Sequence, residues 1–66
     1  MRSISYNPLW KKLIDLKMSK AELADKAGIS RSTLAKMRKD EAVNLDVILK
    51  ICNALDCDVY DVLEIR

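Results

Sequence analysis

The 66-residue chain has no histidine, no phenylalanine, one glycine and one proline. Because glycine and proline dominate tight turns, their scarcity argues against a fold of many short strands and favours helices joined by short links. No apolar run approaches the roughly 18 residues that a membrane-spanning helix needs. The N-terminus also lacks the apolar segment of a signal peptide. We therefore expect one small cytoplasmic domain with no membrane partner.

The lack of histidine also limits the chemistry of the chain. A structural zinc site needs about four Cys or His ligands, and only Cys52 and Cys57 are present. We expect Cys52 to be a small core residue and Cys57 to lie in a loop, both reduced. Without a nucleophile and base pair or a glycine-rich phosphate loop, we expect no enzyme activity, no metal, no cofactor and no small-molecule ligand.

Charge is divided unevenly along the chain. Residues 1–39 carry ten basic and three acidic side chains, whereas residues 40–66 carry two basic and seven acidic ones. This asymmetry favours a basic face for nucleic acid and an acidic end turned away from it. Two unlike solvated surfaces without a partner would give the same asymmetry.

Two helix-start signals flank the single glycine. Ser19 and Glu22 have the spacing of a capping box, which predicts a helix from Lys20 to Ala27. Gly28 can adopt the left-handed conformation that ends this helix. Ser30 can then cap a second helix over about 31–39. Two short helices joined by a tight turn form a helix-turn-helix, whose second helix often enters the DNA major groove.

Three further helices are expected around this unit. The first opens at Pro8 with Asn7 as its cap, and the fourth follows Asn44. The fifth would start after Asp58, although residues 59–65 could also form a strand. In chain order, the five helices are predicted to bury these apolar faces: Leu9, Trp10, Leu13, Ile14 and Leu16; Leu23, Ala24 and Ala27; Leu34 and Met37; Leu45, Ile48, Leu49, Cys52 and Leu55; Val59, Val62 and Leu63.

With Leu34 and Met37 turned inward, the 31–39 helix presents a basic open side. Arg31 can donate two hydrogen bonds to guanine, Ser32 can pair with several base edges, and Lys36 can reach a guanine or a phosphate. Other polar groups are expected to contact phosphates and fix the register. The residues expected at phosphates are Lys20, Thr33, Arg38, Lys39 and Asn44. Thr33 could instead bond back to Ser30 or pack.

Residues 18–34, followed by 44–55 and 59–63, resemble the Cro and phage-repressor type (XRE-like) helix-turn-helix domains. The resemblance covers about residues 8–65. It implies a compact, all-α, five-helix lambda-repressor-like domain over 1–66, with the helix-turn-helix at about 20–39. It also implies base reading by Arg31, Ser32 and Lys36. Its structural positions fall on Ser19, Glu22, Ala24, Gly28, Ile29, Ser30 and Leu34.

The chain departs from that family's pattern at two helix ends. Relatives often have Glu-x-Gly where this chain has Arg38-Lys39-Asp40, and many have glycine where Asp56 stands. The first departure puts the end of the 31–39 helix in question and adds positive charge there. The second makes the end of the fourth helix less favourable.

Two functions remain open from the sequence. The resemblance implies a minimal, stand-alone bacterial transcriptional regulator that binds double-stranded DNA as a homodimer on a palindromic operator. The alternative is a protein-interaction module, such as an antitoxin or an adaptor, on the same fold. Val59, Tyr60 and Ile65 are the expected dimer surface, with Tyr6 and Trp10 as alternatives.

Overall fold

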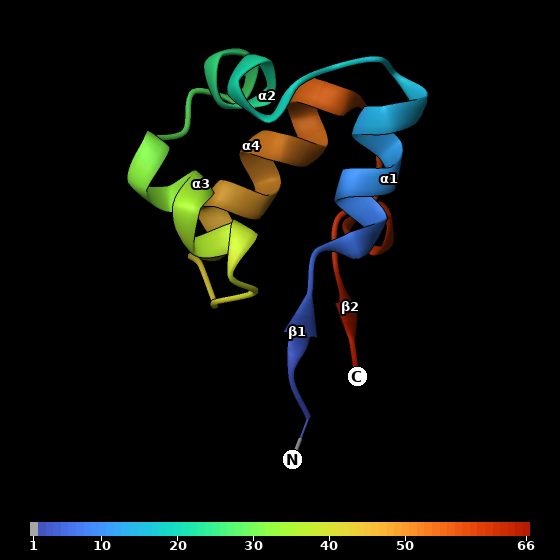
Figure 1. The fold of residues 1–66 in the computed structure, drawn as a ribbon, viewed down its shortest axis with the longest axis vertical. Helices are drawn as coiled ribbons and strands as arrows, with labels where there is room; N and C mark the ends of the chain where they lie inside the picture. The colour runs from blue at the N-terminus through green and yellow to red at the C-terminus, as the bar shows by residue number, and fades with distance from the viewer. Residues whose placement is uncertain (1) are drawn as a thin grey trace.

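The computed structural model describes residues 2–66 and contains four α-helices, a short 3-10 helix and two short strands (Figure 1). In chain order they are β1 (Ile4–Ser5), α1 (Asn7–Asp15), α2 (Lys20–Ala27), α3 (Arg31–Arg38), α4 (Leu45–Leu55), η1 (Val59–Asp61) and β2 (Glu64–Ile65). The mainly helical architecture predicted from the sequence is therefore correct. The expected fifth helix is reduced to η1.

The two ends of the chain pair as an antiparallel ribbon, which brings the termini to the same side of the molecule (Figure 1). Ile4 lies opposite Ile65 and Ser5 opposite Glu64. The ribbon continues with two backbone hydrogen bonds between Ser3 and Arg66, of 3.0 and 2.8 Å. The strand alternative for residues 59–65 is thus correct only at the end of that segment. Strands of two residues are too short to produce a readable alternation.

The first helix begins one residue earlier than expected. Asn7 is already helical and is not the cap, because Tyr6 occupies the N-cap position without a side-chain hydrogen bond. The Ser5 hydroxyl instead accepts a 3.3 Å hydrogen bond from the Asn7 backbone N–H. Pro8 lies in the first turn, as predicted, where its missing N–H needs no partner.

All four α-helices end in the same way, although only one has a glycine at the turn. A residue with positive φ follows each helix: Lys17, Gly28, Asp40 and Asp56. The next backbone N–H then returns to a carbonyl five residues earlier, at 2.9–3.0 Å; the donor and acceptor pairs are Met18 and Leu13, Ile29 and Ala24, Glu41 and Lys36, and Cys57 and Cys52. This bond is the signature of a left-handed helix end. Asp40 and Asp56, which stand where relatives often have glycine, therefore still end α3 and α4 in the left-handed way.

The core lies where all the helices meet. Its buried members are Tyr6, Leu9, Leu13, Leu23, Met37, Ile48, Ile51 and Val62. Several predicted core positions are wrong: Ile14, Leu16, Leu45, Leu49 and Val59 are exposed, and Ile51 is buried instead. On α4 the buried stripe is rotated relative to the predicted one, because α2 packs against the side that holds Ile48 and Ile51.

Candidate nucleic-acid interface

The helix-turn-helix is built from the local signals that the sequence contains. The Ser19 hydroxyl accepts a 3.0 Å hydrogen bond from the Glu22 N–H, and the Glu22 carboxylate accepts one of 3.1 Å from the Ser19 N–H. Gly28 has φ 72° and its N–H donates to the Ala24 carbonyl at 2.9 Å. This reciprocal cap and left-handed turn fix the direction in which α3 leaves α2.

Three hydroxyl groups gather at the start of α3. The Ser30 hydroxyl accepts a 3.1 Å hydrogen bond from the Thr33 N–H, and it lies 3.0 Å from the Ser32 hydroxyl and 2.9 Å from the Thr33 hydroxyl. The back-bonding alternative for Thr33 is therefore observed. The Ser32 hydroxyl is engaged in the same network, so contact with a base would require it to leave Ser30 or to share its hydrogen bond.

Helix α3 buries one side and exposes the other. Leu34 and Met37 are buried against the core, as predicted. The side chains on the outer side are exposed: Arg31, Ser32, Ala35, Lys36, Arg38 and Lys39. The exposed side thus carries four cations and no acidic group, which is the arrangement that a phosphate backbone attracts.

Arg31 has an intramolecular partner at the edge of this side. Its guanidinium lies 3.7 Å from the carboxylate of Asp25 in α2, and both side chains are mostly exposed. Exposed ion pairs of this kind contribute about 0–1 kcal/mol, so the guanidinium can exchange Asp25 for another acceptor at little cost. Sequence reasoning did not find this pair, because the residues lie on different helices.

Two of the expected phosphate contacts share a surface hollow with Lys36. Thr33 and Lys36 of α3 and Asn44, which precedes α4, line a depression of about 110 Å³ together with Ala42, Val43 and Val47. Asn44 occupies the N-cap position of α4 but makes no side-chain capping bond. Its amide is therefore exposed beside the same hollow. The structure brings these three expected contacts together from both sides of the α3–α4 loop.

At the start of the helix-turn-helix, the Lys20 side chain lies close to an aromatic ring. Its amino group lies 4.6 Å from the centre of the Trp10 ring, within the range of a cation–π contact. Trp10 itself is partly buried and packs against the core, which was the simpler of its two expected roles. The contact holds the Lys20 charge near the start of α2.

The end of α3 is tied to the N-terminal segment by a buried tyrosine. The Tyr6 hydroxyl donates a 2.8 Å hydrogen bond to the Glu41 carbonyl, and the Asp40 carboxylate accepts one of 3.1 Å from the Tyr6 N–H. Burial raises the pKa of the Tyr6 phenol above its ordinary value of 10.0, and the nearby Asp40 charge adds to the rise. No local pattern marks this link, which joins residues 34 and 35 positions apart. Because Tyr6 is buried, it cannot form a dimer surface.

Helix α3 ends at Arg38, one residue before the predicted end at Lys39, which is its C-cap, and both side chains remain exposed there. Within residues 2–66, no helix is long and apolar enough to cross a bilayer. No three His, Cys, Asp or Glu side chains of the described chain gather into a metal site.

Comparisons with known proteins agree on the type of domain. A family profile described as the Cro/C1-type HTH DNA-binding domain matches residues 8–66. The chain is 38% identical over 52 residues to the uncharacterized HTH-type transcriptional regulator YozG of Bacillus subtilis (strain 168). The matched region covers 76% of this chain and 62% of that relative, so the chain spans less than two thirds of the relative's length.

The fold is also similar to a solved structure. The crystal structure of the transcriptional regulator VanUg matches with a TM-score of 0.95 and 49% sequence identity, covering 98% of this chain and 87% of that one. The similarity extends over the terminal ribbon as well as the helices, since almost the whole chain is aligned. The family is one of DNA-binding domains, in agreement with the expectation that the chain is not an enzyme. On the evidence of the profile, the relative and the fold, the chain belongs to the Cro/C1-type helix-turn-helix DNA-binding domain family.

Proposed function

We propose that the chain is a sequence-specific transcriptional regulator that reads the DNA major groove with α3. The observation that carries this proposal is the exposed basic side of α3, set at a fixed angle by the capped turn between Ala27 and Arg31. Residues near the N-terminus of such a helix reach base edges. Arg31 is the leading base contact, because its guanidinium can bond guanine O6 and N7 together.

Ser32 and Lys36 complete the proposed base-reading set. Both are exposed on the same side as Arg31. The Ser32 hydroxyl can donate or accept once it leaves or shares its hydrogen bond with Ser30, so it tolerates several base edges and adds little discrimination. Lys36 lies beside the hollow formed with Thr33 and Asn44, where its ammonium group can approach either a base or a phosphate.

The remaining polar groups are proposed to hold the DNA backbone. Thr33 and Asn44 flank the hollow on one side of α3, Arg38 and Lys39 extend from its end, and Lys20 lies at the start of α2. Contacts of this kind position the protein without carrying sequence information. Their number sets how steeply affinity falls with salt.

We further infer that two copies bind a palindromic operator. A single domain with 66 residues offers few base contacts, and helix-turn-helix dimers bind half-sites separated by about one helical turn. The relatives named as transcriptional regulators support regulation as the role of that binding. Repression and activation make the same demands on this surface.

Selection from a random duplex library at near-physiological salt tests the proposal. We expect an enriched palindrome, and we expect Arg31→Ala to weaken binding to it roughly 10-fold or more while weakening binding to random DNA much less. Arg66→Ala is the matched control, because Arg66 is also an exposed arginine paired with a carboxylate, at 3.2 Å, but lies on the terminal ribbon.

Two results would contradict the proposal. Equal losses on all sequences would remove Arg31 as a base reader and leave it as a phosphate contact. Absence of any enriched sequence, with only weak salt-sensitive binding, would favour the protein-interaction alternative.

A further inference from the structure

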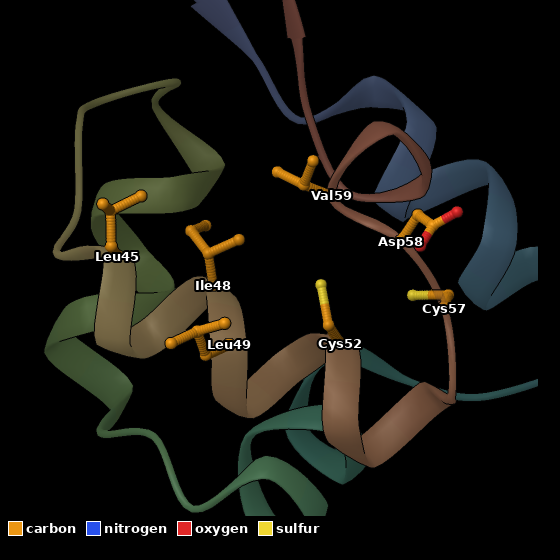
Figure 2. A pocket seen from close by; sticks show the side chains of 7 residues that line it. All are labelled: Leu45, Ile48, Leu49, Cys52, Cys57, Asp58 and Val59. Atoms are coloured by element: carbon orange, nitrogen blue, oxygen red, sulfur yellow. The ribbon is translucent and has the colours of Figure 1, made fainter.

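The only two cysteines of the chain meet at the end of α4 (Figure 2). Cys52 lies in the last turn of α4, and Cys57 lies in the link between α4 and η1. Both are free and half-buried, and both line an apolar groove of about 490 Å³ between these two elements. The sulfur of Cys57 is turned toward the sulfur of Cys52 (Figure 2). A pair of neighbouring thiols therefore lies in a surface groove that a small reactant can enter.

The left-handed end of α4 is the feature that brings the two cysteines together. The Cys57 N–H donates a 3.0 Å hydrogen bond to the Cys52 carbonyl, and Asp56 has φ 51°. Because this bond joins the two residues directly, standard bond lengths place their α-carbons less than about 7 Å apart. Side chains at these two positions of a left-handed helix end commonly touch. Disulfides join cysteines whose α-carbons are about 4.4–6.8 Å apart, so the backbone is already close to the required geometry.

We propose that Cys52 and Cys57 are a modification site, at which a low-molecular-weight disulfide oxidises the two thiols to an intramolecular disulfide. One cysteine thiolate attacks a sulfur of the reactant, which releases half of itself as a thiolate and leaves a mixed disulfide. The other cysteine then attacks the protein sulfur of that bond and displaces the second half. The protein loses two electrons and two protons, and the reactant is reduced to two thiols. The inference is independent of the proposed function.

The pKa of Cys57 determines how fast this reaction proceeds. Burial raises the pKa of the Cys57 thiol above its ordinary value of 9.0, and Cys52 adds to the rise. Of the charged groups on neighbouring elements, Lys12 lowers this pKa and Asp61 raises it. Because the thiolate is the nucleophile, a thiol that stays protonated reacts slowly. Oxidation should therefore be slow at neutral pH and become faster as pH rises.

The disulfide would tie the end of α4 to η1. Helix α4 packs against α2, and η1 packs against α1, so the bond would join two parts of one small core. Small domains gain stability from such staples. Because closing the loop removes conformations from the unfolded chain, we expect the oxidised chain to unfold at a temperature roughly 5–15 °C higher. The groove includes no residue of α3, so the bond should leave the outer side of α3 unchanged.

Oxidised glutathione is the probe that tests the site. After incubation of the folded chain, a maleimide blocks the remaining thiols and the intact mass is measured. We expect a product two hydrogen atoms lighter than the reduced chain, with no maleimide or glutathione attached. In urea, the same conversion should need at least about 10-fold more oxidised relative to reduced glutathione, because a bond that stabilises the fold is equally favoured by the fold. Thermal unfolding of the reduced and oxidised chains measures the change in the midpoint.

The double variant Cys52→Ser/Asn53→Cys is the matched control. It keeps two thiols but moves one of them by a single position, to an exposed site about 100° around α4. In urea it should form its disulfide as readily as the wild type does. In the folded state it should stop at mixed disulfides with glutathione, because the helix holds the two sulfurs apart. Circular dichroism checks that both proteins are folded before oxidation.

Four results would overturn the proposed site. The first is a folded wild type that stops at mixed disulfides with glutathione, and the second is a disulfide that links two chains. The third is a control variant that closes its disulfide in the folded state as readily as the wild type. The fourth is an oxidised wild type that unfolds at a lower temperature than the reduced one, which would show that the bond strains the end of α4.

Discussion

Three of the four α-helices are followed by a residue other than glycine in the left-handed region, and these positions carry a conformational cost. Lys17 has φ 55° and its side chain is exposed. For an L-residue, the left-handed conformation costs roughly 1–2 kcal/mol, and aspartate bears it more readily than lysine. Lys17 is therefore the position at which glycine should relieve most strain.

We expect Lys17→Gly to raise the free energy of unfolding by about 0.5–1 kcal/mol, because the relief exceeds the added entropy of the unfolded chain. Urea unfolding followed by circular dichroism measures the change. Lys11→Gly is the matched control: Lys11 is exposed in the middle of α1, where glycine should cost about 1 kcal/mol. Equal destabilisation by both substitutions would show that the Lys17 conformation carries no strain.

Single residues also determine how much could be predicted. The capping box at Ser19, the turn at Gly28 and the cap at Ser30 act within three or four positions, so their pattern is readable in the sequence. The Tyr6 link to Asp40 and Glu41 depends on the finished fold and leaves no periodic trace. The predicted apolar face of α4 is wrong for the same reason. Leu45 and Leu49 have the spacing of core residues but are exposed, and only the packing of the finished fold shows that Ile51 is buried instead.

At the scale of elements, Tyr6 joins the start of α1 to the end of α3. The two hydrogen bonds reach Asp40 and Glu41 in the α3–α4 turn. The Glu41 N–H in turn donates to the Lys36 carbonyl in the last part of α3. Loss of the phenolic bond would leave the Glu41 carbonyl without that partner. The end of α3, where Arg38 and Lys39 lie, would then be held less firmly.

We expect Tyr6→Phe to lower the free energy of unfolding by about 1–2 kcal/mol at neutral pH. The pH dependence has a defined sign. Because the pKa of Tyr6 is raised in the folded chain, the folded state disfavours the phenolate, so this contribution is complete below pH 10.0 and is lost as pH rises through the folded pKa. Between pH 8 and 11, the free energy of unfolding should decrease less steeply with pH in Tyr6→Phe than in the wild type.

Cys57 also contributes to the loss of stability at alkaline pH, and its contribution begins at a lower pH than that of Tyr6. Its pKa is also raised, mainly by burial and then by Cys52, from an ordinary value of 9.0. The variant should therefore retain the loss that begins near pH 9.0 and lack the later one. Identical alkaline curves for the two proteins would mean that Tyr6 does not titrate in this way.

At the scale of the whole molecule, the chain has two electrically distinct halves. The basic part contains α1, α2 and α3, and the acidic part contains α4, η1 and β2. Such a division orients the molecule as it approaches DNA, so that the helix-turn-helix arrives first.

Lys20 allows the electrostatic part of this arrangement to be measured. Its ammonium group lies over the only tryptophan of the chain, so the fluorescence of Trp10 reports on its position. If Lys20 contacts a phosphate, Lys20→Ala should weaken binding to all sequences and reduce the slope of log affinity against log salt by about 0.9. Lys50→Ala is the control, because Lys50 is exposed on α4 and pairs with Asp46 at 3.4 Å.

The emission of Trp10 then distinguishes two ways in which Lys20 could act. A phosphate that draws the ammonium group away from the ring would change the emission on DNA binding in the wild type, and this change would be absent in Lys20→Ala. An unchanged salt slope in Lys20→Ala, with the same emission change as in the wild type, would remove Lys20 from the contacts. Its charge would then serve to hold Trp10 against α2, and Arg38, Lys39 and the Thr33–Asn44 hollow would carry the backbone contacts alone.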